Sequence, residues 1–159
     1  MHPRVRELIQ DLQLNPHPEG GYYAETYRSD WEFSTDHGSR NLMTCIYFLL
    51  TSTNISRFHQ IKSDEMWFFH EGSPLTVHIL SEEGYEKLLV GPVDKEGHLP
   101  YQLVKSGVVF GSTVDHPDSF SLVACVVAPG FDFKDFKLFE KEELLERWPE
   151  HHQIIERLS

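Results

Sequence analysis

Basic residues are scarce in this chain of 159 residues. Fourteen lysines and arginines stand against 25 aspartates and glutamates, which gives a formal net charge of −11 at pH 7. Because a surface of that sign repels a phosphate backbone, we expect no nucleic-acid partner. Acidity serves solubility in many proteins, so it does not identify a substrate.

Long apolar runs and cysteines are also rare. The first residues, MHPRVRELIQDLQ, lack the apolar core of a secretory signal peptide, and no stretch approaches the roughly 18 apolar residues of a membrane helix. We therefore expect a cytoplasmic protein with no membrane partner. Cys45 and Cys125 are the only cysteines, and both lie in apolar runs. We interpret them as free thiols because two such residues make no disulfide framework.

Several common catalytic signatures are missing. The chain contains no GxGxxG, GxxxxGK[ST], HExxH, GxSxG or CxxC pattern. These absences argue against a dinucleotide-binding or P-loop fold, a zinc protease, a serine hydrolase and a thiol redox enzyme.

Aromatic residues are plentiful, at 13% of the chain, and their bulk suits strands and the inside of a barrel. From residue 42 onward, short apolar runs alternate with turn residues. The runs are MTCIYFLL, SRFHQI, EMWFFH, LTVHIL, EKLLVG, YQLVKSGVVFG and SFSLVACVVA. Runs of this length and spacing predict an all-β barrel or sandwich. We also expect FDFKDFKLF, after Pro129 and Gly130, to be extended.

Helical spacing is confined to the two ends of the chain. Apolar residues from Val5 to Leu12 recur at intervals of three and four, which predicts a short amphipathic helix. Two further short helices are predicted at about 140–158, interrupted by Pro149. We expect one domain over 1–159, with the barrel at about 22–139.

The most informative segment is RFHQIKSDEMWFFHEG at 57–72. It places His59, Glu65 and Gly72 at a spacing that resembles the first motif of cupin barrels, in which two histidines, a glutamate and a glycine line a hairpin. If the turn between the strands is tight, His59 and Glu65 meet inside the barrel. Ile61 occupies the position of the second histidine. A buried polar pair that holds one strand to the next is the plain alternative.

The second cupin motif is also incomplete. Within 97–110, Gly107 is in place, Lys105 replaces a proline, and Phe110 stands where the last histidine would be. Two of the four metal ligands are therefore apolar, whereas a stable metal site needs three or four donors. We expect no cofactor and no tightly held metal. A metal held by His59 and Glu65 with outside donors, from Gln102, His70 or His78, stays an alternative.

Four phrases in order carry a more specific resemblance. They are HPEGGYYAETYRSD at 17–30, IYFLL at 46–50, SRFHQIKSDEMWFFHEG at 56–72 and VVAPGFDFKDFKLF at 126–139. Over nearly its whole length the chain resembles the cupin-5 family, formerly domain of unknown function 985, of RmlC-like jelly-roll cupins. The resemblance implies an all-β double-stranded β-helix that forms a homodimer. It implies no settled reaction, although family members are similar in fold to sugar-nucleotide epimerases and isomerases.

Our first hypothesis is a metal-independent cupin that binds a small polar metabolite and isomerises or epimerises it by proton transfer. His59 would be the base and Glu65 would orient it or act as the acid. Trp67 and Phe110 would form apolar walls, while Arg57 or Gln102 at the mouth would hold an anionic or hydroxyl group.

Two alternatives belong to other functional classes. One is a small-molecule-binding cupin without catalysis, and the other is a metal-dependent oxygenase or hydrolase. Homodimer formation is a separate expectation. It rests on the resemblance and on the extended segment 22–28, which could add to a partner's sheet.

Overall fold

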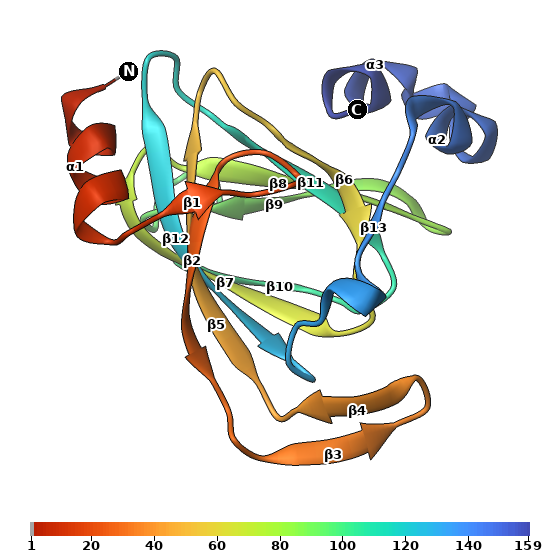
Figure 1. Ribbon diagram of the computed structural model, residues 1–159. Helices are drawn as coiled ribbons and strands as arrows, with labels where there is room; N and C mark the ends of the chain where they lie inside the picture. The colour runs from red at the N-terminus through yellow and green to blue at the C-terminus, as the bar shows by residue number, and fades with distance from the viewer. Residues whose placement is uncertain (1) are drawn as a thin grey trace.

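Two antiparallel sheets face each other in a computed structural model that describes residues 2–159 (Figure 1). The six-stranded sheet has the order β1 (Asn15–Pro16), β2 (Tyr22–Arg28), β5 (Thr44–Thr51), β12 (Phe120–Ala128), β7 (Asp64–Gly72) and β10 (Tyr101–Val104). The five-stranded sheet has the order β13 (Lys137–Leu138), β6 (Ser56–Gln60), β11 (Val109–Val114), β8 (Leu75–Ser81) and β9 (Gly84–Val90). The predicted all-β jelly roll with short flanking helices is confirmed.

The core lies between the two sheets. Strand side chains alternate between faces, so β7 and β8 each send every second residue inward. Trp67, Val77 and Phe110 belong to this inner cluster and are almost fully buried. The sequence predicted the strands well because each inner face must be apolar to pack against the opposite sheet.

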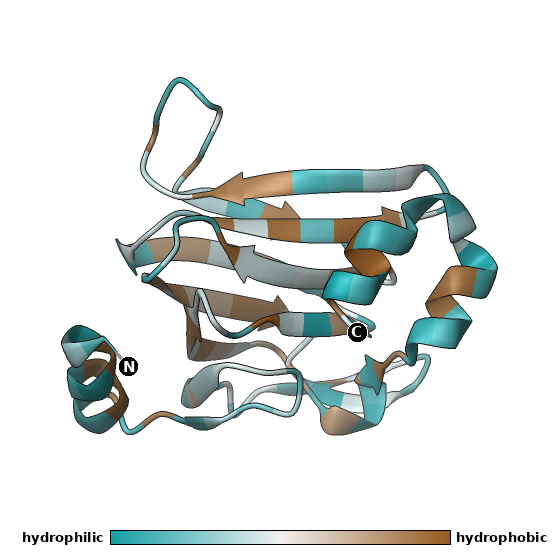
Figure 2. Ribbon diagram, turned by 90° about the horizontal axis from the view of Figure 1, so that it is seen from above, coloured by the Kyte–Doolittle hydropathy of each residue, from teal (hydrophilic) through white to brown (hydrophobic). Residues whose placement is uncertain are grey.

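Helices cover the outer faces of the sheets. α1 (Pro3–Asp11) packs Val5 and Leu8 against the six-stranded sheet. α2 (Lys141–Arg147), the 3-10 helix η2 (Pro149–His151) and α3 (His152–Arg157) pack on the five-stranded sheet. Figure 2 shows the N-terminal helix and the C-terminal helices at opposite ends of the molecule. Both faces of β8 are buried because the core lies on one side and these C-terminal helices on the other.

The expected hairpin between His59 and Glu65 was wrong. β6 and β7 do not pair, because β6 belongs to the five-stranded sheet and β7 to the six-stranded one. Residues 61–63 therefore cross from one sheet to the other. The sequence fixes the alternation of side chains along a strand but not which strand becomes its hydrogen-bonded neighbour.

The expectation for FDFKDFKLF was wrong in part. Its middle forms a 3-10 helix, η1 (Phe133–Asp135), and extended pairing returns only in β13. The Asp132 side chain accepts a hydrogen bond from the Lys134 backbone N–H at 2.9 Å, which stabilises the start of η1.

A hairpin that we did not predict projects from the barrel. β3 (Glu32–Thr35) and β4 (Gly38–Asn41) form this arm, which extends away from both sheets in Figure 1. The buried Arg40 guanidinium binds the carboxylate of Asp135 through two hydrogen bonds of 2.7 Å. The arm is thereby tied to η1.

Two smaller points bear on the sequence predictions. Cys45 and Cys125 are free thiols, as expected. No helix within residues 2–159 is both long enough and apolar enough to cross a membrane.

Candidate functional site

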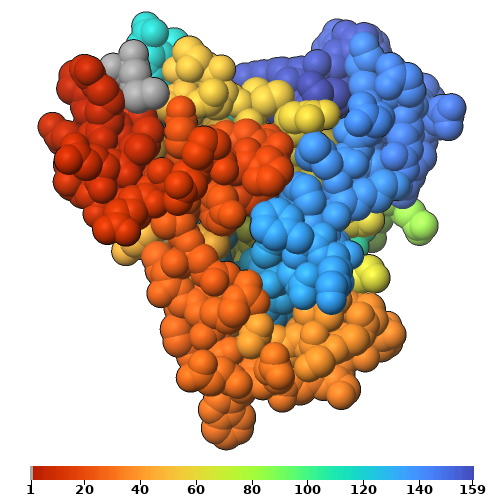
Figure 3. Space-filling model, in the orientation of Figure 1, coloured from red at the N-terminus to blue at the C-terminus, as the bar shows by residue number. Residues whose placement is uncertain are grey.

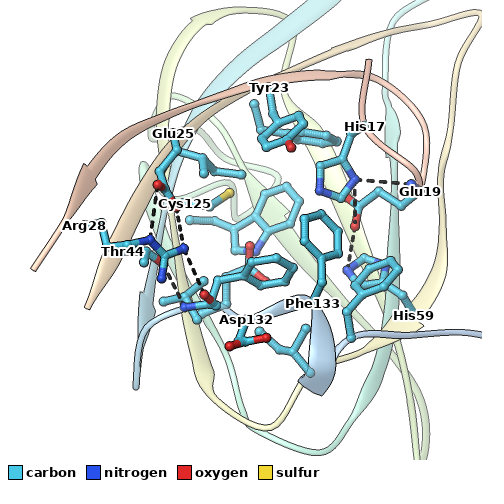
Figure 4. A pocket seen from close by; sticks show the side chains of 18 residues that line it. His17, Glu19, Tyr23, Glu25, Arg28, Thr44, His59, Cys125, Asp132 and Phe133 are labelled. Carbon is cyan, nitrogen blue, oxygen red and sulfur yellow. Dashed lines mark hydrogen bonds and ion pairs between the residues drawn. The ribbon is translucent and has the colours of Figure 1, made fainter. Parts of the chain in front are cut away.

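A cavity of about 480 Å³ opens between the two sheets and is the best candidate for a functional site. Figure 4 shows His17, Glu19 and His59 at one end and Glu25 and Arg28 at the other. Aromatic rings form much of the wall; they belong to Tyr23, Phe48, Trp67, Phe131, Phe133 and Phe136. On the surface, the region around η1 (light blue) lies beside the β1–β2 region (orange-red), as Figure 3 shows.

A buried ion pair lies at one end of the cavity. The Nε2 atom of His59 is 3.0 Å from Oε2 of Glu19, and its Nδ1 atom is 2.7 Å from the Arg57 carbonyl oxygen. The Ser56 hydroxyl donates to the other carboxylate oxygen of Glu19 at 2.8 Å. Both nitrogens of the His59 ring are therefore engaged by the protein.

The two partners stabilise each other's charge. Burial opposes the charged form of both groups, but their mutual attraction and hydrogen bond outweigh it. As a result, the pKa of His59 is raised and the pKa of Glu19 is lowered. The pair therefore favours the charged form of each partner, an imidazolium next to a carboxylate.

The turn before β2 brings Glu19 to this position. Gly20 has a φ of 111°, and a Cβ atom there would lie 2.0 Å from the Ile55 carbonyl oxygen. A side chain is excluded by both the backbone angle and the space. The Glu19 carbonyl also accepts a hydrogen bond from the Arg57 backbone N–H at 2.8 Å, which fastens the turn to β6.

His17 and Glu19 were missed as site residues in the sequence. The segment HPEGG indicated a turn, and nothing in its local pattern shows that the turn packs against β6, about forty residues later. The only available signal was that polar residues of the turn lie within one of the four phrases that carry the family resemblance.

Glu65, on the inner face of β7, lines the same cavity as this ion pair. Its side chain is buried and takes part in no ion pair in the described part of the chain. Burial and the negative charge of Glu19 raise its pKa to about 7, although His59 and a hydrogen bond from the Cys125 thiol act in the opposite direction. The carboxyl group can therefore both donate and accept a proton near neutral pH.

The cavity contains little free positive charge. Arg28 lines it, but its guanidinium binds the Glu25 carboxylate at 2.6 Å and the Phe131 carbonyl oxygen at 3.0 Å. Asp132 adds a further carboxylate to the lining. His59 is paired with Glu19, and His17, the remaining basic group of the lining, lies 3.6 Å from the same carboxylate with its pKa lowered by burial.

The structure brings three of the six predicted site residues to the cavity. His59, Glu65 and Trp67 line it. Phe110 is buried with its ring centroid 4.1 Å from that of His59, so it supports the imidazole without belonging to the lining. Arg57 and Gln102 are not in the lining either, and the Gln102 amide donates to the Leu89 carbonyl oxygen.

The donor set of the cavity does not fit a cupin metal site. The positions of two ligands are filled by Ile61 and Phe110, which have no donor atoms. Among the residues that the structure describes, the one group of three donors converging within 4.8 Å is Asp94, Glu96 and His98, outside this cavity. Neither His70 nor His78 lines the cavity, and His78 is bound by Tyr85 and Thr113.

Comparison with known proteins gives the family. The profile described as Cupin superfamily (DUF985), named Cupin_5, matches residues 6–139. This chain belongs to that cupin family. A curated relative, an uncharacterized protein of Saccharomyces cerevisiae, is 31% identical over 156 residues, which cover 89% of this cupin and 78% of the relative.

Several solved structures have the same fold as this cupin. A protein of Shewanella oneidensis is 42% identical with a TM-score of 0.91, covering 98% of this cupin and 96% of that chain. A hypothetical protein from Leishmania major is 38% identical with a TM-score of 0.90, covering 98% of both chains. Oxalate decarboxylase of Bacillus subtilis has a TM-score of 0.58 at 16% identity, covering 95% of this cupin and 38% of that chain, so it shares the fold alone.

Proposed function

We propose that this cupin binds a small polar metabolite in the cavity and isomerises or epimerises it by proton transfer. One observation carries the proposal: Glu65 is a buried carboxyl group in an accessible cavity, and its pKa is raised to about 7. A group with that pKa exchanges a proton at neutral pH with little driving force in either direction. Perturbed carboxyl groups of this kind cluster at functional sites.

The positions of the hydrogen bonds change the roles that we expected from the sequence. His59 was expected to be the base, but both of its nitrogens are engaged and its pKa is raised. Glu65 is the group whose proton is free to move. We therefore assign proton transfer to Glu65, and a fixed electrostatic and positioning role to the ion pair of His59 and Glu19.

The test is the entry of solvent deuterium into carbon-bound positions. The protein is incubated in D₂O with a defined panel of neutral sugars and hydroxyketones. The molecular mass of each compound is then measured by mass spectrometry. We expect one or more compounds to gain a deuteron from solvent, because a proton taken by Glu65 exchanges before it returns. A panel in which no member gains deuterium faster than in buffer alone would contradict the proposal.

A binding protein without catalysis is the alternative that this test separates. The same cavity and the same ion pair serve recognition equally well, and the fold does not decide between the two. In that case compounds bind and protect the protein against unfolding, but none exchanges hydrogen with solvent.

We also propose that two copies of this cupin associate through the β2 edge. β1 pairs only with Tyr22 and Tyr23, which leaves the outer edge of 24–28 without a strand within residues 2–159. Trp31, in the short link between β2 and the arm, is 79% exposed. An open edge beside exposed aromatic side chains favours strand addition by a partner.

Light scattering tests this proposal. We expect twice the chain mass of 18.5 kDa for the native protein and a shift toward the monomer for Trp31→Glu. Val93→Glu is the matched control, since Val93 is 74% exposed and lies between β9 and β10, and β10 is at the other end of the sheet from β2. A native mass of 18.5 kDa at micromolar concentration would refute the dimer.

A further inference from the structure

The turn before β2 holds the His17 imidazole in one protonation state. Its Nδ1 atom accepts a hydrogen bond from the Glu19 backbone N–H at 3.2 Å, so Nδ1 carries no proton. Burial lowers the pKa of the ring, although the Glu19 carboxylate acts in the opposite direction. The ring therefore favours the neutral form, with its one proton on Nε2.

The Nε2 atom of His17 is a donor that opens into the cavity. The side chain is 7% exposed and lines the cavity, and Nε2 makes no hydrogen bond within residues 2–159. Four side-chain polar atoms in the same range are both enclosed and unpaired; they belong to His37, Trp67, Ser112 and Ser121. Nε2 of His17 is not one of them, so part of its surface is accessible. Figure 4 shows it pointing away from Glu19 and toward the middle of the cavity.

The backbone and a neighbouring ring fix the direction of this donor. The His17 backbone N–H donates to the Gly21 carbonyl oxygen at 3.0 Å, and the His17 carbonyl oxygen accepts from the Gly20 N–H at 3.0 Å. The Tyr23 ring meets the imidazole edge-on, with centroids 4.6 Å apart and an interplanar angle of 80°. Because the donor is in place before a ligand arrives, binding costs little side-chain freedom.

The Glu65 carboxyl group opens into the same cavity. A thiol has one proton, so Cys125 serves one carboxyl oxygen at most. The other oxygen has no hydrogen-bond partner among the described residues and is not one of the four enclosed atoms, so it is accessible. Oε2 of Glu19 lies 3.6 Å from Nδ1 of His17, and the charge of Glu19 helps to raise the pKa of Glu65. One small molecule can therefore contact both His17 and Glu65.

The charges of the lining favour an uncharged oxygen at His17. The carboxyl groups of the lining belong to Glu19, Glu25, Glu65 and Asp132, and its basic groups to His17, Arg28 and His59. Arg28 is paired with Glu25 and His59 with Glu19, while the lowered pKa of His17 favours its neutral form. A carboxylate or phosphate at Nε2 would be buried beside carboxyl groups without a free cation, which is costly. An ammonium group has no lone pair to accept the N–H.

We propose that His17 is a catalytic residue and that the substrate is a neutral carbonyl compound whose oxygen accepts a hydrogen bond from His17 Nε2. The inference rests on the proposed proton transfer and names its substrate class. The Glu65 carboxylate takes a proton from the carbon next to the carbonyl group. The electron pair of the broken C–H bond forms a C=C bond, and the π pair of the carbonyl group moves to its oxygen. The His17 N–H stabilises this enolate, and return of the proton to carbon restores the carbonyl compound.

Three probes of similar size test the recognition in NMR titrations. Hydroxyacetone has the carbonyl oxygen, methallyl alcohol has a CH₂ group in its place, and pyruvate keeps the ketone but carries a carboxylate. We expect hydroxyacetone to bind about 3- to 10-fold more tightly than methallyl alcohol, the value of one neutral hydrogen bond, and more tightly than pyruvate. In His17→Phe the ratio between the first two should fall to about 1. His70→Phe, the same change at an exposed position of β7, should leave it unchanged.

A second readout uses the native protein and does not depend on the folding of a variant. Two-bond correlations between ring protons and nitrogen-15 distinguish the two neutral forms of a histidine, and the His17 ring is assigned through its own backbone signals. We expect the form with the proton on Nε2 at pH 7. Hydroxyacetone should shift the Nε2 resonance of His17, and methallyl alcohol should not.

Deuterium exchange tests the catalytic role with two variants of opposite design. His17→Phe keeps a ring against Tyr23 but removes the donor, so we expect solvent deuterium to enter hydroxyacetone about 10²- to 10³-fold more slowly than with the native protein. His17→Gln loses the ring but keeps an N–H that reaches toward the same point, so it should recover part of this rate. A merely structural role would give the reverse order, because the phenyl ring preserves the packing better.

Four results would overturn the inference: equal binding of hydroxyacetone and methallyl alcohol, tighter binding of pyruvate, an unmoved Nε2 resonance, or faster exchange in His17→Phe than in His17→Gln. The two proposals fail separately. If hydroxyacetone shifts the resonance but gains no deuterium faster than in buffer, recognition by His17 stands and proton transfer fails. If it gains deuterium through Glu65 equally fast in the native protein and in His17→Phe, proton transfer stands and this inference fails.

Discussion

Glu65→Gln is expected to slow the entry of solvent deuterium into the substrate by at least about 100-fold, because general acid–base groups contribute about 10² to 10⁴ in rate. Glutamine keeps the size and the hydrogen-bonding capacity of the side chain but cannot take up a proton at neutral pH. Ligand binding should change much less than the exchange rate. Mass spectrometry of the panel in D₂O measures both the rate and its dependence on the variant.

The pH profile of the native protein adds an independent check. The ionised carboxylate is the form that removes a proton from carbon, and the pKa of Glu65 is about 7. The exchange rate of the free enzyme should therefore rise with pH and level off above about 7. Glu86→Gln is the matched control, since it makes the same chemical change at an exposed position of β9. If Glu65→Gln and Glu86→Gln exchange deuterium equally fast, Glu65 is not the acid–base group.

The free energy of unfolding is expected to fall as pH rises through the range in which Glu65 titrates. Its pKa is raised from 4.5, the ordinary value, to about 7 in the folded protein. The folded state therefore holds the proton more tightly than the unfolded chain does, so this contribution is complete below pH 4.5 and is lost as the pH approaches 7. Each pKa unit corresponds to about 1.4 kcal/mol, so the loss in the free energy of unfolding amounts to about 3 kcal/mol.

Urea unfolding at a series of pH values tests this effect without any knowledge of the substrate. Glu65→Gln does not titrate, so its stability relative to the native protein should increase by about 3 kcal/mol between pH 4.5 and pH 7.5. Glu86→Gln should show no such trend. A stability difference between Glu65→Gln and the native protein that is independent of pH would mean that the carboxyl group is ordinary in the folded state.

Local patterns in the sequence predicted much of the barrel. Apolar runs between turn residues predicted the strands, because one face of each strand must be buried away from water. Apolar residues that recur every three and four positions predicted the N-terminal helix, whose Val5 and Leu8 are buried. The arm of β3 and β4 was missed because it lies outside the core, so its residues carry no pattern of burial.

The site was predictable only in part, for a related reason. His59, Glu65 and Trp67 were found because a local spacing places them on inner faces of strands, and all three line the cavity. Glu19 was missed because its contact with His59 joins residues forty positions apart. Such a contact depends on how a turn packs against a strand far away in the sequence. The periodic pattern of apolar residues within one segment carries no information on that packing.

The sequence by itself determined the fold family, the inward direction of His59 and Glu65, and the loss of two metal-ligand positions at Ile61 and Phe110. Each of these follows from residue type and from alternation along a strand. Only the tertiary structure decided that His59 pairs with Glu19 and leaves Glu65 without an ion-pair partner in the described residues. The physical reason is that charge and pKa depend on distances across the cavity, and those distances are set by packing between two sheets.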